Sequence, residues 1–118
     1  MKIAYASRTG NVESIVNNLG YDDALRIDDG SETIEEEYVL FTYTDGFGDI
    51  PMEVESFLEG NADFLQGVVV SGDKGYGEAY CLSGDKIAEM YNVDVLYRVE
   101  NDGTDDDLAA IEAKLAEL

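Results

Sequence analysis

Apolar residues along this chain fall into two recurring patterns. Short continuous runs rich in β-branched and aromatic residues are typical of buried β-strands, and they cover residues 2–6, 24–27, 38–43, 67–71 and 93–99. Segments with an apolar residue every three or four positions are typical of helices, and they cover residues 11–19, 51–58, 83–91 and the segment after Thr104. A polar stretch, residues 28–37, separates the second and third strands. The pattern therefore predicts alternating strands and helices.

This alternation favours one parallel sheet with right-handed crossovers. The fourth strand contains Val68-Val69-Val70, which is apolar on both faces, as central parallel strands are. A chain of 118 residues has the length of one domain. We therefore predict a single flavodoxin-like domain over residues 1–118. Its architecture would be a three-layer α/β/α sandwich around a five-stranded parallel sheet in the order 2-1-3-4-5.

The loop after the first strand has the composition of a phosphate-binding loop. It reads Ser7-Arg8-Thr9-Gly10-Asn11 and leads directly into the first helix. Two hydroxyl groups can donate hydrogen bonds, a glycine allows close backbone approach, and the helix start supplies N–H groups with a favourable dipole. The same residue types also make ordinary helix caps, so this loop taken alone leaves both interpretations open.

Other phosphate-binding motifs are absent from this loop. It has no Gly-Lys-Ser/Thr of a nucleotide-hydrolysing P-loop and no Gly-x-Gly-x-x-Gly dinucleotide fingerprint. It also lacks the cysteine of a small phosphatase, and the first strand does not end in the acidic residues of a phospho-receiver. These exclusions leave FMN as the expected ligand.

Two further loops follow the third and fourth strands, where ligands bind in sheets of this order. Residues 42–49 place Phe47 between two glycines, so that backbone or aromatic ring could lie along a flat ligand; a simple loop anchor is the other interpretation of Phe47. Residues 71–80 contain three glycines and Tyr76, whose ring could stack on an isoalloxazine. Each loop is weak support alone, but together the three loops predict a flavin site.

Composition narrows the function further. There are 27 acidic against 7 basic residues, a formal net charge of −20, which disfavours nucleic acid and anionic membranes as partners. The acidity suits a basic partner, but it could equally serve solubility or a salty habitat. No apolar run approaches the ~20 residues of a membrane span, and no signal peptide is evident, so we expect a cytoplasmic protein.

The scarcity of histidine and cysteine limits the chemistry of the side chains. Histidine is absent and Cys81 is the only cysteine, so Ser-His and Cys-His nucleophile systems, internal disulfides and thiolate metal clusters are excluded. The usual transition-metal ligand is therefore absent as well.

Motifs along nearly the whole chain resemble the NrdI family. They are Ser7-x-Thr9-Gly10-Asn11-Val12, Thr42-Tyr43-Thr44, Gly46-Phe47-Gly48 with Pro51, Ser71-Gly72, Tyr76-Gly77 and Glu100-x-x-Gly103-Thr104. The resemblance implies an FMN protein that serves class Ib ribonucleotide reductase. In that family the reduced flavin reacts with molecular oxygen, and the superoxide formed helps to assemble a dimanganese–tyrosyl radical cofactor in the small (radical) subunit. An electron-donating reductase would be the second protein partner. The metal belongs to the radical subunit in that family, so the resemblance implies no metal site in this chain, and chemistry on the flavin with no catalytic side chain.

By position, the resemblance assigns cofactor contacts to all three loops. Phosphate would be held by Ser7, Arg8, Thr9, Gly10, Asn11 and Val12, and the ring would be lined by Thr42, Tyr43, Thr44, Gly46, Phe47 and Gly48 on one side and by Ser71, Gly72, Tyr76, Gly77 and Glu78 on the other. Two other functions stay open: a general flavodoxin-type electron carrier, and a non-catalytic acidic interaction module on the same scaffold.

Overall fold

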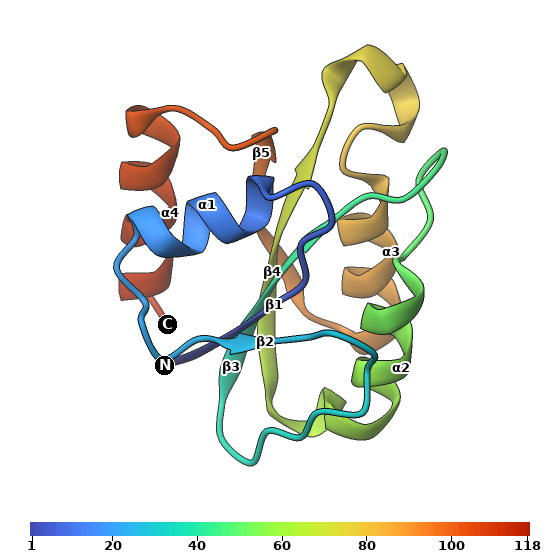
Figure 1. The fold of residues 1–118 in the computed structure, drawn as a ribbon, viewed down its shortest axis with the longest axis vertical. Coiled ribbons are helices and arrows are strands. Elements are labelled where there is room, and N and C mark those ends of the chain that lie inside the picture. Colours follow the sequence, from blue (N-terminus) through green and yellow to red (C-terminus); the bar gives the residue numbers. More distant parts are fainter.

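All five predicted strands are present in the computed structural model, which describes residues 1–118. They pair in parallel in the order β2-β1-β3-β4-β5, so the predicted topology is confirmed (Figure 1). The strands are β1 (Lys2–Tyr5), β2 (Leu25–Arg26), β3 (Tyr38–Tyr43), β4 (Leu65–Gly72) and β5 (Asp94–Glu100). Because every strand runs the same way, their carboxyl ends meet at one edge of the sheet.

Four helices cover the two faces of this sheet. They are α1 (Asn11–Asn18), α2 (Met52–Asn61), α3 (Leu82–Tyr91) and α4 (Asp105–Ala116). Figure 1 shows α1 and α4 on one face and α2 and α3 on the other, which confirms the three layers. None of these helices is long and apolar enough to span a membrane.

The core is divided by the sheet into two apolar clusters. Val68 packs in the cluster that contains α2 residues such as Phe57, and Val69 packs in the cluster that contains α1 residues such as Ile15. Both valines are at most 2% exposed. The fourth strand is therefore buried on both faces, as its continuous apolar run predicts.

The polar stretch between β2 and β3 is held by side chains instead of a helix. The Glu32 carboxylate accepts hydrogen bonds from the N–H groups of Asp28 (2.8 Å) and Gly30 (3.0 Å). The Asn61 side chain accepts from the Ile34 N–H (3.0 Å) and donates to the Glu32 carbonyl (2.9 Å). These bonds satisfy backbone groups that a helix would have paired internally.

The structure differs from the sequence expectation in one longer helix and two additional 3₁₀ helices, and most other element ends shift by one or two residues. Helix α2 continues beyond residue 58 to Asn61, whose side chain is needed for the contacts just described. Two short 3₁₀ helices, η1 (Ala62–Phe64) and η2 (Lys74–Ala79), were not predicted. In η2 the Asp73 side chain caps the first turn by accepting from the Gly75 N–H, a local interaction that hydrophobic periodicity does not reveal.

We predict that Asn61→Leu lowers the free energy of unfolding by about 3 kcal/mol. The substitution removes the hydrogen-bond partner of the buried Ile34 N–H and the side-chain donor to the Glu32 and Phe57 carbonyls. Urea denaturation followed by circular dichroism measures this loss. Asn17→Leu is the matched control, since Asn17 is exposed on α1, and its effect should stay within about 0.5 kcal/mol. Equal stability of the two variants would contradict this role for Asn61.

Candidate functional site

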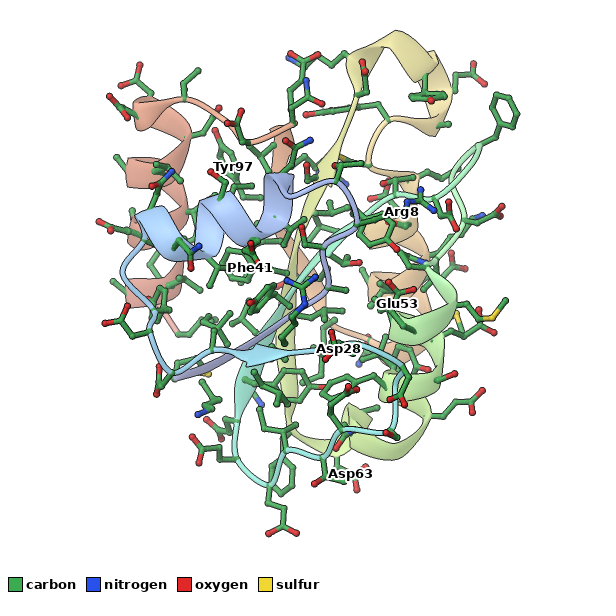
Figure 2. The ribbon with its side chains drawn as sticks, in the orientation of Figure 1. Arg8, Asp28, Phe41, Glu53, Asp63 and Tyr97 are labelled. Atoms are coloured by element: carbon green, nitrogen blue, oxygen red, sulfur yellow. The ribbon has the colours of Figure 1, made fainter.

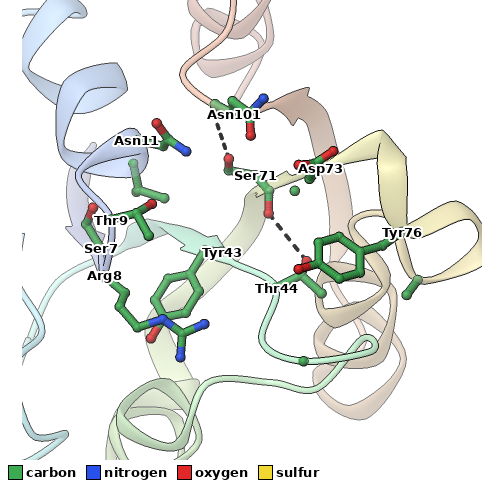
Figure 3. A pocket seen from close by; sticks show the side chains of 14 residues that line it. Ser7, Arg8, Thr9, Asn11, Tyr43, Thr44, Ser71, Asp73, Tyr76 and Asn101 are labelled. Carbon is green, nitrogen blue, oxygen red and sulfur yellow. Dashed lines mark hydrogen bonds between the residues drawn. The ribbon is translucent and has the colours of Figure 1, made fainter.

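A cavity of about 200 Å³ lies beyond the carboxyl ends of β1, β3 and β4 (Figure 3). The three loops predicted from the sequence converge on it. Of the predicted site residues, those in its wall are Ser7, Arg8, Thr9, Asn11, Val12, Tyr43, Thr44, Gly46, Ser71, Gly72 and Tyr76. The topology therefore brings together residues that are more than 60 positions apart in the sequence.

Six other predicted residues stand beside the cavity and not in its wall. They are Gly10, Thr42, Phe47, Gly48, Gly77 and Glu78. Thr42 is only 1% exposed within β3, whereas Phe47 is 83% exposed at the tip of its loop. Phe47 is therefore exposed to solvent and does not line the cavity.

Three residues of the wall were not predicted: Asp73, Ala79 and Asn101. Asn101 follows β5 and adopts a left-handed backbone conformation (φ 54°), which asparagine tolerates better than most residues. Its carbonyl accepts from the Ser71 hydroxyl (2.6 Å), and its N–H donates to the Gly72 carbonyl (2.8 Å). The Asn-Asp-Gly sequence after the fifth strand could have indicated that Asn101 lines the cavity, because the fifth strand ends at the same edge of the sheet.

The first loop presents a run of unpaired backbone donors. None of the N–H groups of residues 7–12 donates a hydrogen bond within the protein. Gly10 caps α1 in a left-handed conformation (φ 93°) and offers no capping side chain, while the Ser7 hydroxyl accepts only from the Glu13 N–H (3.2 Å). Free N–H groups at a helix start, with the hydroxyl of Thr9 beside them, match the oxygens of a phosphate.

Arg26, at the end of β2, supports this first loop from behind. Its guanidinium donates to the Ser7 carbonyl (3.2 Å) and forms ion pairs with Glu13 and Asp28. The ion pair with Glu13 neutralises an acidic side chain in the first turn of α1, next to the free N–H groups. Arg26 therefore fixes the loop and reduces the negative charge beside it.

A network of hydroxyl groups fixes the strand ends below the second loop. The Thr44 hydroxyl donates to the Ser71 carbonyl (3.3 Å) and lies 3.1 Å from the Ser83 hydroxyl. Ser83 is fully buried and donates to the Tyr43 carbonyl (3.0 Å). Strands β3 and β4 and helix α3 are thereby joined at the floor of the cavity.

Tyr43 forms one side of the cavity and remains neutral. Burial, followed by the hydrogen bond that its hydroxyl donates to the Glu53 carboxylate (2.7 Å), raises the pKa of Tyr43 well above its ordinary value. The Arg8 guanidinium lies 4.9 Å from the centre of the Tyr43 ring and 2.8 Å from the Asp45 carboxylate. The hydrogen bond to Asp45 also raises the pKa of Arg8.

Two exposed aromatic rings flank the mouth of the cavity. Phe47 of the second loop and Tyr76 of the third meet edge to face, with ring centres 6.2 Å apart and planes at 78°. The Phe47 loop is a tight turn closed by two backbone bonds between Asp45 and Asp49, of 2.9 and 2.7 Å. An aromatic pair at a rim, over a wall that contains neutral donors and Tyr43, suits a flat ring attached to a phosphate.

The chemistry of the donor set therefore fits a flavin mononucleotide. No group of three or more His, Cys, Asp or Glu side chains in the chain is placed to hold a metal ion. The wall offers hydroxyl, amide and backbone donors and the Arg8 guanidinium, but no imidazole or thiol. What this arrangement can do is bind and orient a phosphate-bearing ring system.

Three known proteins that are similar in sequence carry one family name. The family model described as "NrdI Flavodoxin like" matches residues 3–113. A protein NrdI of Bacillus licheniformis is 37% identical over 92% of this chain and 82% of its own length. A protein NrdI of Macrococcus caseolyticus is 36% identical over all of this chain and 91% of its own length. The SPbeta prophage-derived protein NrdI of Bacillus subtilis is 38% identical over 92% of this chain and 86% of its own length.

Solved structures show the same fold. A short-chain flavodoxin associated with a bacterial microcompartment superimposes with a TM-score of 0.78 at 19% identity, covering 99% of this chain and 94% of its own. A flavodoxin of the pneumococcal strain TIGR4 superimposes with a TM-score of 0.71 at 28% identity, covering 99% of this chain and 95% of its own. Both neighbours confirm the predicted fold.

Cys81 is fully buried behind the third loop, as expected of a small apolar residue. Burial raises the pKa of the Cys81 thiol to about 11, so at pH 8 about 0.1% is thiolate, the reactive form. We predict that native protein reacts with a thiol reagent at least about 100-fold more slowly than denatured protein, measured as chromophore release over time. Rapid reaction of the native protein would contradict this environment.

Proposed function

The chain belongs to the NrdI flavodoxin-like family, and we propose that it binds FMN and activates a class Ib ribonucleotide reductase in the cytoplasm. The single observation that carries the cofactor assignment is the run of free N–H groups at residues 7–12. The partner assignment rests on the family.

The phosphate of FMN would bind at the first loop, where the donors of residues 7–12 and the Thr9 hydroxyl meet the start of α1. A dianion is favoured there by the helix dipole, an effect of about 0.3–1 kcal/mol per charge near a helix end. The ring would lie between the second and third loops. We propose that Thr42, Gly48, Gly77 and Glu78 shape these loops while Tyr43, Thr44, Gly46 and Tyr76 provide the contacts.

When bound and reduced, the flavin would supply one electron to molecular oxygen, giving superoxide for assembly of the radical cofactor in the small subunit. The protein's own part is to hold the ring, keep Tyr43 neutral beside it and leave its rim accessible to oxygen. An electron-donating reductase would restore the reduced state. The metal required by the assembly would belong to the partner.

The exposed pair Phe47–Tyr76 supports a docking surface at this rim. Phe47 is 83% exposed and Tyr76 is 56% exposed. Large aromatic side chains with this much exposure are typical of protein–protein interaction sites. We propose that the small subunit covers this pair, so that superoxide is released directly toward its metal site. The net charge of −20 would accelerate encounter with any basic surface on that partner.

A general electron carrier is the second candidate, and the flavodoxin neighbours in fold favour it. Such a carrier would bind FMN at the same loops but would not generate the tyrosyl radical in the small subunit. An acidic interaction module, in contrast, would bind no FMN at all.

We predict that Gly10→Glu weakens FMN binding at least about 100-fold, because the new side chain places a carboxylate at the helix start and strains a backbone with φ 93°. Fluorescence titration of the cofactor-free protein measures the dissociation constant. Gly20→Glu is a matched control: its φ is 84°, and a Cβ at either glycine meets no other atom within 4 Å. Tight FMN binding by Gly10→Glu would overturn the assigned phosphate site.

We predict that Phe47→Glu lowers radical formation at least about fivefold while FMN binding is retained, because Phe47 stands outside the cavity wall. The assay mixes reduced holoprotein, manganese-loaded small subunit and oxygen, and counts tyrosyl radical by electron paramagnetic resonance. Phe64→Glu, at an exposed aromatic on η1, is the control and should activate fully. Full activation by Phe47→Glu would reject the docking surface, and no radical with the unmodified protein would favour the electron carrier.

A further inference from the structure

Arg8 is the only basic residue in the cavity wall. Its guanidinium Nη2 lies 2.8 Å from Asp45 Oδ1, and its Cζ lies 4.9 Å from the centre of the Tyr43 ring. Arg8 belongs to the first loop, whereas Asp45 and Tyr43 belong to the second. The side chain therefore bridges two of the three loops that surround the cavity.

The Arg8 side chain is directed to the second loop and not to the start of α1. Figure 3 shows it running beside the Tyr43 ring, away from Asn11 and Ser71. The donors for a phosphate are already present as backbone N–H groups of residues 7–12 and the Thr9 hydroxyl. The Arg8 side chain is thus paired with the second loop, while other donors in the first loop are free.

Both partners of Arg8 are themselves anchored. The Asp45 backbone closes the turn through its two bonds with Asp49, and the Tyr43 hydroxyl is held by Glu53 of α2. The ion pair of Arg8 with Asp45 therefore fixes the position of the whole turn, residues 45–49. Figure 2 shows Arg8 and Glu53 on the same side of the molecule, around the start of this loop.

We propose that Arg8 is a positioning residue that holds the second loop against the first through Asp45 and Tyr43. It then stabilises a bound flavin from the ring side, and its contribution does not depend on the cofactor's phosphate. This inference rests on the proposed FMN site and refines it, since Arg8 joins two loops where the family resemblance alone assigns it to the phosphate.

The bridge is partly exposed, so its effect is moderate. The Arg8 side chain is 56% exposed and that of Asp45 39%. An exposed ion pair combined with a cation–π contact corresponds to roughly a three- to tenfold change in an equilibrium constant. Salt should weaken the bridge, because the Debye length falls to about 3 Å at about 1 M.

The first test compares FMN with riboflavin, which lacks the phosphate. We expect Arg8→Gln to raise the dissociation constants of both by the same three- to tenfold factor, measured by fluorescence titration. Arg98→Gln is the matched control: Arg98 pairs with Asp85, is 47% exposed and lies outside the cavity wall, so it should bind as the unmodified protein does. A loss confined to FMN would make Arg8 a phosphate ligand and overturn the proposal, and so would no loss for either.

The second test asks whether Arg8 acts through Asp45. We expect Asp45→Asn to weaken binding of both flavins by part of the Arg8→Gln factor, since the contact of Arg8 with the Tyr43 ring remains, and the double variant to bind no more weakly than Arg8→Gln alone. Arg8→Lys should restore part of the affinity, since the positive charge returns without the planar guanidinium. Additive losses in the double variant would show that the two residues act separately and would refute the bridge.

A third measurement needs no cofactor. The N–H groups of Gly48 and Asp49 donate to the Asp45 carbonyl, so their hydrogen exchange reports the order of the turn. We expect faster exchange in Arg8→Gln and in the unmodified protein at about 1 M salt, with no further salt effect in the variant. Unchanged exchange would overturn the proposal. Failure of the unmodified protein to bind FMN would instead refute the proposed function, while the exchange data would still decide on the bridge.

Discussion

The site depends on one constraint, which is that the backbone turns from β1 into α1 without satisfying its own donors. Six consecutive N–H groups point to no acceptor within the protein, at the end of the sheet where three loops converge. In a chain with 27 acidic residues, an anion is held most readily where fixed dipoles replace basic side chains. Arg26 strengthens this arrangement because it both holds the Ser7 carbonyl and neutralises Glu13.

Around these donors the molecule combines a rigid floor with an exposed rim. The floor consists of buried or half-buried hydroxyl groups, including Ser83 and Thr44, that tie β3 and β4 to α3. The rim consists of short glycine-containing turns that carry Phe47 and Tyr76 outward. Under the proposed function, binding of the ring and contact with a second protein would therefore use different parts of the same three loops.

Local patterns predicted the elements and the order of the sheet, because buried strands and amphipathic helices leave distinct apolar spacing. They also placed the three loops, since the position of a ligand follows from the sheet order. What they could not predict depends on contacts between distant residues. The Asn61 side chain accepts a hydrogen bond from the Ile34 N–H, 27 positions away in the sequence. The Asn101 carbonyl, in the cavity wall, accepts one from the Ser71 hydroxyl, 30 positions away. The pairing of Arg8 with Asp45 likewise becomes visible only when two loops are brought together.

The two outer strands of the sheet bear on how this protein behaves when it is crowded. An unpaired strand edge invites neighbouring copies to add their own strands, which is a common route to insoluble fibrils. On one side β2 offers only two residues, too little for a lasting intermolecular ladder. On the other side β5 has seven residues but carries Asp94 and Glu100 at its ends and Arg98 between them. Two copies meeting there would also bring together their large like charges, which opposes pairing of their strands at this edge in spite of the exposed aromatic rim.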